Sequence, residues 1–200
     1  RFDKFLLTGC VTFSNVQFND NSIQAKNFSN CEDSINIINS TGSLKDIKIT
    51  NSSTDSLDID NSNLDLNYVE IKNAKNDCID LSFGSYNFKK IKTEICYDKS
   101  VSVGERSLVN IENIEIFDSK TGVVSKDSSK VFLKSFAGKN IKSFCLSAYN
   151  KKQEFEGGQI LYNKLVCNSV NLLSNNYSKK NNSKHVYFDN LSEIKWKELN

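Results

Sequence analysis

The sequence predicts an all-β solenoid, in which the chain coils and stacks turns of equal length on one another. Three observations predict it. One apolar pattern recurs every 22 residues, apolar and polar residues alternate within that pattern, and the intervening segments are rich in asparagine, which supplies 27 of the 200 residues. Asparagine disfavours helices and favours turns, because its side chain bonds to nearby backbone and it tolerates the left-handed region.

The first predicted strand of each repeat begins after a small residue. An apolar residue follows, and a second one comes two places later, which is the period of a strand with one buried face. The small and first apolar residues recur at Ser34-Ile35, Ser56-Leu57, Cys78-Ile79, Ser100-Val101 and Gly122-Val123. First strands are therefore expected at a constant interval of 22 residues.

Two further apolar rows keep this spacing and predict a second and a third strand in each repeat. The second row is Leu64 with Leu66, Tyr86 with Phe88, Val109 with Ile111 and Val131 with Leu133. The third row is Ile47 with Ile49, Val69 with Ile71, Ile91 with Thr93 and Ile114 with Ile116. No segment is long enough for a crossover helix between parallel neighbours, so we expect each strand to pair with its counterpart in the next turn.

This is the pattern of a right-handed parallel β-helix with three short strands per turn of ~22 residues. The chain resembles the pectate-lyase-like superfamily of such proteins over roughly residues 5–175. The fold hosts enzymes, adhesins and phage spikes alike, so the resemblance implies the architecture more strongly than any one activity.

We expect one β-helix domain over residues 1–200, with regular turns at about 5–175 and a loop and C-terminal cap at 176–200. Two excursions interrupt the period: about nine extra residues between Phe18 and Ile35, and the segment 151–158. Insertions in solenoids map to loops, often on the binding face. Because the chain begins at Arg1 without a methionine and its first turn has no obvious cap, we also expect a fragment of a longer protein.

The charge balance bears on the partners. A net charge of +2 is too small to predict a nucleic-acid partner. No apolar run approaches the ~20 residues that cross a bilayer, so no transmembrane segment is expected. Residues 1–100 carry a net charge of −3 and residues 101–200 a net charge of +5. One end of the solenoid is therefore expected to be acidic and the other basic.

The cysteines do not have the spacing of a zinc site, and the chain has a single histidine, His185. We expect free buried thiols that stack on neighbouring turns. The alternative is a disulfide between adjacent turns, such as Cys10 with Cys31. The six cysteines are Cys10, Cys31, Cys78, Cys96, Cys145 and Cys167.

Two polar columns are expected to be structural, because stacked hydroxyls and carboxamides satisfy backbone groups between coils. One is a serine column, made of Ser40, Ser62, Ser85, Ser107 and Ser129. The other is an asparagine column after the third strand, made of Asn51, Asn73 and Asn140.

The outward row of the first strands carries the predicted site. Its members, about 4.8 Å apart, are Asn36, Asp58, Asp80, Ser102, Val124 and Ser147. Asp58 and Asp80 form a carboxylate pair that either repels or binds a cation, and an oxygen-rich site suits calcium. The following rows add Asp60, Ser82, Glu105, Lys126, Asp127, Tyr149 and Asn150, with Lys99, Arg106, Lys151 and Lys152 nearby.

The resemblance implies a mechanism for these residues. In β-helix polysaccharide lyases and epimerases, a carboxylate-bound calcium neutralises a uronate, and a lysine or arginine takes the proton next to it. Carried over to this chain, Asp58 and Asp80 would hold the calcium. The catalytic residues would be Lys126 as the base, with Arg106 and Tyr149 on the sugar acid, and the substrate-binding residues would be Lys99, Glu105, Asp127, Lys151 and Lys152. As an alternative, all of these are solvated strand-face and turn residues.

Three functions fit these expectations. The first is a secreted or cell-surface domain that binds an extended polysaccharide along its outer strand face. The second is a calcium-assisted polysaccharide lyase or uronate epimerase. The third is a structural spike or adhesin segment that packs against copies of itself as a homotrimer. The fold favours an extracellular or cell-surface location for all three.

Overall fold

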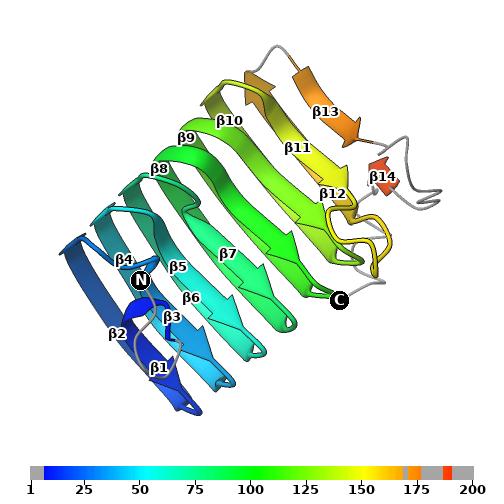
Figure 1. Ribbon diagram of the computed structural model, residues 1–200. Helices are drawn as coiled ribbons and strands as arrows, with labels where there is room; N and C mark the ends of the chain where they lie inside the picture. The colour runs from blue at the N-terminus through cyan, green and yellow to red at the C-terminus, as the bar shows by residue number, and fades with distance from the viewer. Residues whose placement is uncertain (1–6, 169–170, 177–186, 191–200) are drawn as a thin grey trace.

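The predicted solenoid is confirmed. The computed structural model describes residues 7–168, 171–176 and 187–190, and these residues form a parallel β-solenoid of about 6 turns. Figure 1 shows the turns stacked side by side from the N-terminal to the C-terminal end. None of the described residues forms a helix that could span a membrane. Most of the predicted loop and cap at 176–200 lies outside the described residues.

Short and long strands alternate along the chain, and each pairs in parallel with its counterpart one turn away. The short strands are β1 (Gly9–Ser14), β3 (Asp33–Ile38), β5 (Asp55–Asp60), β7 (Ile79–Ser82), β11 (Phe144–Tyr149) and β13 (Asn171–Asn176). The long strands are β2 (Gln17–Phe28), β4 (Thr41–Ser52), β6 (Asn63–Ala74), β8 (Ser85–Gly104), β9 (Leu108–Lys126), β10 (Lys130–Ile141) and β12 (Gln159–Asn168). Strand β14 (Tyr187–Asn190) pairs with β12.

The second and third predicted strands of each turn form one long strand with an irregularity in its middle. The pairing between β4 and β6 leaves out Lys45 and Asn67 at this point. The same omission recurs in later turns at Lys89, Glu112 and Lys134. Strands β8 and β9 are longer still, because each runs on into the first strand of the following turn.

Inward side chains of successive turns stack into one continuous core. Ile35, Leu57, Ile79 and Val101 lie next to one another along the first-strand row, and all four are buried. The constant interval lets equivalent apolar positions meet, so each turn buries the face that it could not bury alone. The three predicted apolar rows are all part of this core.

One of the two predicted excursions is a loop and the other is wrong. Residues 150–158, here called the 150–158 loop, lie between β11 and β12. Between Phe18 and Ile35, by contrast, β2 continues and pairs with β4, which places Ile23 beside Ile47. A register shift between Asn19 and Ser22 absorbs the extra length, and it hid the third-row residues of this turn from the repeat.

Two columns of left-handed residues mark the corners of the turns. The first column, with φ between 56° and 61°, consists of Asn27, Asn51, Asn73, Ile95, Asp118 and Asn140. Asn51 and Asn73 each donate from Nδ2 to the asparagine one turn before, at 2.8 Å, which confirms the predicted asparagine column. The second column, with φ between 44° and 57°, consists of Asn15, Asn39, Asn61, Phe83, Glu105 and Asp127. Asparagine tolerates this backbone better than bulky residues do.

The serine column is present with one correction. Ser62 Oγ accepts the backbone N–H of Ser40 at 2.9 Å, as the column predicts. Ser85 lies one residue outside the column, which passes through Gly84 instead. There the hydroxyl of Tyr86 takes over the role of the serine and donates to a backbone carbonyl at 2.7 Å. A Cβ at Gly84 would collide with that hydroxyl, so only glycine leaves room for it.

The prediction of free thiols is wrong, because the six cysteines form three disulfides and none is free. The Cα–Cα distances, from 5.4 to 6.4 Å, lie in the usual range for disulfides. The coil returns the chain to the neighbouring turn after 18 to 22 residues, so partners from different rows meet. The pairs are Cys10–Cys31, which was the alternative drawn from the sequence, Cys78–Cys96 and Cys145–Cys167.

Candidate functional site

The predicted outward row of the first strands has the expected register, but most of it is covered. Parallel pairing sets in one row Asn36, Asp58, Asp80, Ser102, Val124 and Ser147. Asn36 and Ser102 expose 0% of their surface, and only Asp58 and Asp80 are partly exposed. The row therefore offers two carboxylates rather than a continuous open track for a polymer.

Four aspartates at the N-terminal end of this face form an acidic cluster, which consists of Asp33, Asp55, Asp58 and Asp60. Burial, followed by repulsion from neighbouring carboxylates, raises the pKa of Asp55 to about 7 and the pKa of Asp58 to about 10. Burial also raises the pKa of Asp33 to about 6 and raises that of Asp60. The cluster therefore retains protons near neutral pH unless a cation lies beside it.

The contacts around Asp58 and Asp80 provide part of a calcium shell. Two buried oxygens nearby, Asp33 Oδ2 and Asn36 Oδ1, have no hydrogen-bond partner among the described residues, and an unpaired buried oxygen is costly. Asp80, however, faces Lys126, and residues 7–168 contain no group of three acidic, histidine or cysteine side chains arranged to hold a metal. Calcium takes about 6–8 oxygen ligands, so these residues alone do not complete a site.

Lys126 lies beside two other residues of the predicted site. Its Nζ donates to Ser102 Oγ at 2.9 Å and lies 3.7 Å from Asp80 Oδ1, and its side chain exposes only 7% of its surface. Tyr149 pairs with Lys126 in the next turn, and burial raises the pKa of its hydroxyl. A Cβ at Gly104 would come within 2.9 Å of Lys126 Cε, so this glycine leaves space for the lysine stem.

Lys99 is occupied by acids of its own part of the solenoid. It forms ion pairs with Asp77 and Asp98. Burial alone would lower the pKa of Lys99, but the two carboxylates outweigh burial, so that pKa is raised. As the protein stands, Lys99 neutralises these carboxylates.

Four predicted substrate-binding residues hold the 150–158 loop on the solenoid. Asp127 Oδ1 accepts the backbone N–H groups of Lys151 and Lys152 at 2.7 and 2.8 Å. Glu105 accepts a hydrogen bond from Ser82 Oγ at 2.7 Å and pairs with the Lys152 ammonium. Burial tends to raise the pKa of Glu105, but these two partners lower it overall. The loop is thereby fixed at its first residues.

Arg106 contacts a different part of the molecule from Lys126. Its side chain is exposed, and its guanidinium carbon lies 5.4 Å from the ring centre of Phe155 in the 150–158 loop. No hydrogen bond or ion pair within residues 7–168 joins Arg106 to Lys126 or to Asp80. The structure thus brings Lys126, Tyr149 and Asp80 together and leaves Arg106 apart from them.

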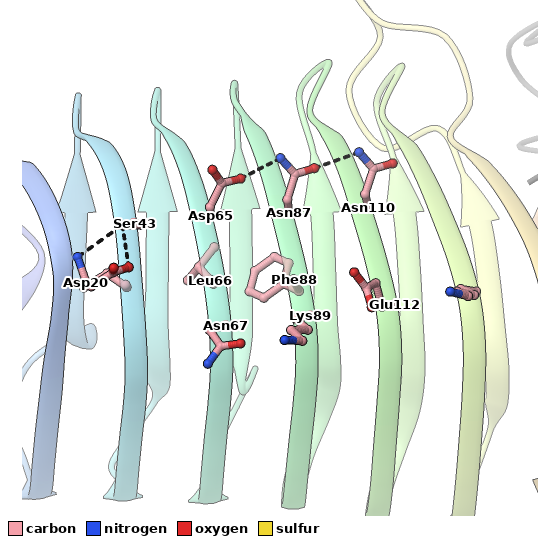
Figure 2. Close-up of a pocket in the computed structure, with 12 residues that line it drawn as sticks. Asp20, Ser43, Asp65, Leu66, Asn67, Asn87, Phe88, Lys89, Asn110 and Glu112 are labelled. Carbon is pink, nitrogen blue, oxygen red and sulfur yellow. Dashed lines mark hydrogen bonds between the residues drawn. The ribbon is translucent and has the colours of Figure 1, made fainter. Parts of the chain in front are cut away.

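A groove of about 620 Å³ crosses the long strands where their pairing is interrupted (Figure 2). One polar ladder runs along it: Asn87 donates to Asp65, and Asn110 donates to Asn87, each from Nδ2 at 2.8 Å. The residues that line it are Asp20, Ser43, Leu44, Asp65, Leu66, Asn67, Asn87, Phe88, Lys89, Asn110, Glu112 and Lys134. The leucines and the phenylalanine are buried, so its accessible side chains are polar.

The sequence prediction of the site overlooked this groove. A signal was present, since Asp65, Asn87 and Asn110 follow one another at 22 and 23 residues, and a second polar row follows two residues later. That second row is Asn67, Lys89, Glu112 and Lys134. Both rows keep the period of the core, which places their members side by side on the outer face. The groove itself depends on the irregularity in the long strands, which the repeat does not reveal.

No family model matches the chain, and no curated protein or solved structure matches it. The class of protein is therefore defined by the fold, which is a parallel β-solenoid.

Proposed function

We propose that the protein binds an extended polysaccharide along the groove of Figure 2. The observation that carries the proposal is the exposed ladder of Asp65, Asn87 and Asn110, which repeats one polar position from turn to turn. Successive strands are ~4.8 Å apart, so the ladder presents evenly spaced donors and acceptors. Each carboxamide uses one N–H in the ladder and keeps a second for a ligand.

The charges of the groove favour a neutral or weakly charged polymer. The acids Asp20, Asp65 and Glu112 share the groove with the bases Lys89 and Lys134. A strongly anionic chain would need a field of one sign, which this mixture does not provide. Sugar hydroxyls both donate and accept, and they therefore suit a surface that mixes carboxylates, carboxamides and ammonium groups.

The proposal includes an extracellular or cell-surface location. Three disulfides support it, because disulfides form and persist in oxidising compartments and are rare in the cytosol.

A glycan array, followed by calorimetry on the best linear ligand, tests the function. We expect Asn87→Ala to weaken binding by about tenfold, since it breaks the ladder at its centre. The matched control is Asn113→Ala, which removes an exposed asparagine outside the groove and should leave affinity unchanged. Absence of binding to every glycan, or equal affinity of the Asn87→Ala variant and the unaltered protein, would contradict the proposal.

The convergence of Lys126, Asp80 and Tyr149 favours a second candidate, the calcium-assisted lyase or epimerase. Incubation with polygalacturonate or alginate, with and without calcium, would then produce unsaturated uronate or change the uronate configuration. Lys126→Met should abolish either change. If neither glycan binding nor turnover occurs and sedimentation gives the mass of three chains, the structural homotrimer is the better explanation.

A further inference from the structure

One turn corner breaks the rule that its own column follows. Asn15, Asn39 and Asn61 occupy the second left-handed column, and the next turn has Phe83 there, with a φ of 48°. A bulky side chain in this region is strained, whereas asparagine at the same place is not. The ring of Phe83 is nevertheless 46% exposed. The backbone position alone therefore does not explain the choice of phenylalanine.

Two side chains extend this exposed ring into a larger surface, here called the aromatic edge and made of Phe83, Phe155 and Arg106. The rings of Phe83 and Phe155 meet edge to face, with centres 6.3 Å apart. The guanidinium of Arg106 lies over the ring of Phe155 at 5.4 Å. Arg106 has no carboxylate partner among the described residues, so its donors remain available.

The 150–158 loop holds Phe155 in place before any ligand arrives. Asn150 donates from Nδ2 to the backbone carbonyl of Glu156 at 3.1 Å, and Glu156 N–H donates to Ser128 Oγ at 2.8 Å. At the far end, Gly158 N–H donates to the carbonyl of Tyr149 at 3.1 Å. Rigid aromatic side chains lose little conformational entropy on binding, which makes them effective anchors.

The aromatic edge borders the groove. Phe83 precedes Asn87 by four residues, a distance of at most ~13 Å along an extended chain. Figure 2 shows that the ladder of Asp65, Asn87 and Asn110 lies at the end of the groove nearest the turns that precede β6 and β8. A chain that follows the ladder therefore reaches Phe83 within a short extension.

We propose that the aromatic edge is a stacking subsite for a neutral pyranose ring of the polysaccharide held in the groove. The proposal rests on the proposed function and narrows it to sugars that present an apolar face. The C–H groups on that face carry slight positive charge and pack on the electron-rich face of an aromatic ring. Arg106 offers its N–H donors to the hydroxyls at the rim of the same sugar.

Phe83→Asn is the decisive variant, because it restores the residue type of the column while it removes the ring. The probes are the β-1,4-linked hexasaccharides of glucose, N-acetylglucosamine and xylose, measured by calorimetry. We expect Phe83→Asn to weaken binding by about tenfold or more with an unchanged or higher melting temperature, and Phe83→Tyr to retain affinity. Ile95→Asn makes the same kind of corner change in the other column and should not alter affinity.

The outcomes separate this inference from the proposed function. If a probe binds and Phe83→Asn leaves its affinity unchanged, the stacking subsite is wrong while the groove stands. If Phe83→Asn lowers the melting temperature by more than about 5 °C, Phe83 is a structural anchor of the loop and the inference fails. If no probe binds but an acidic glycan on the array does, the neutral subsite is overturned and the proposed function survives. Absence of any glycan binding overturns both.

Discussion

The ammonium of Lys126 lies 3.7 Å from the carboxylate of Asp80, which sits two turns earlier in the solenoid. Between them Lys126 donates to Ser102 in the intervening turn. Three successive turns are therefore joined by one side chain, and the acidic end of the first-strand face terminates at this lysine. The relationship also decides how much cation the carboxylates of the row still need.

Lys126→Met tests the strength of this connection. The change keeps the stem and removes the ammonium, so we expect the free energy of unfolding near pH 8 to fall by about 1–3 kcal/mol. Asp80→Asn in the same chain should recover part of the loss, because the unpaired carboxylate disappears with it. Urea unfolding of both single variants and the double variant measures this coupling. Strictly additive losses would show that the two groups do not interact.

The constant repeat explains why much of this arrangement could be predicted. With strands paired in register, a spacing of 22 residues makes Asp58 the neighbour of Asp80, and the row follows. The path of the Lys126 side chain could not be predicted, because it depends on the space left by Gly104. The groove was missed for a related reason, since it arises from a backbone irregularity at residues such as Asn67 and Lys89 that the apolar rows do not record.

Stability should fall as the pH rises through the neutral range. The acidic cluster has pKa values above the ordinary 3.8, about 6 for Asp33, about 7 for Asp55 and about 10 for Asp58. Between 3.8 and those values the folded state binds more protons than the unfolded state, so the free energy of unfolding decreases with rising pH. Urea unfolding from pH 4 to pH 9 measures the trend.

Asp58→Asn is the control for this pH dependence. It should raise the free energy of unfolding at pH 8 by about 1–2 kcal/mol and flatten the profile, because it removes one buried charge from the acidic cluster. If calcium binds Asp58 and Asp80, millimolar calcium should raise the melting temperature at pH 8 far more than at pH 5, and Asp58→Asn should abolish the effect. A profile that rises with pH would contradict the assignment.

Ile95 offers a stabilising substitution. It is a β-branched residue at a φ of 58° in a column otherwise made of asparagine and aspartate. Ile95→Asn should raise the free energy of unfolding by about 1 kcal/mol, because it relieves backbone strain and its carboxamide can reach Asn73 in the turn before. Thermal unfolding measures the gain. Ile95→Val keeps the branched side chain and should show no gain, and equal stabilities of the two variants would refute the explanation.

The disulfides give the largest predicted effect on stability. Cys78 and Cys96 are both buried and are separated by 18 residues, and a crosslink over a loop of this length stabilises a fold by about 3 kcal/mol through its constraint on the unfolded chain. We expect Cys78→Ala with Cys96→Ala to lower the free energy of unfolding by about this amount in urea. Thiol titration of the unreduced protein in denaturant should find no free thiol, whereas free buried thiols would give six. An unchanged urea midpoint in the double variant would show that the crosslink does not support the fold, and the stacked rows alone would then hold these turns together.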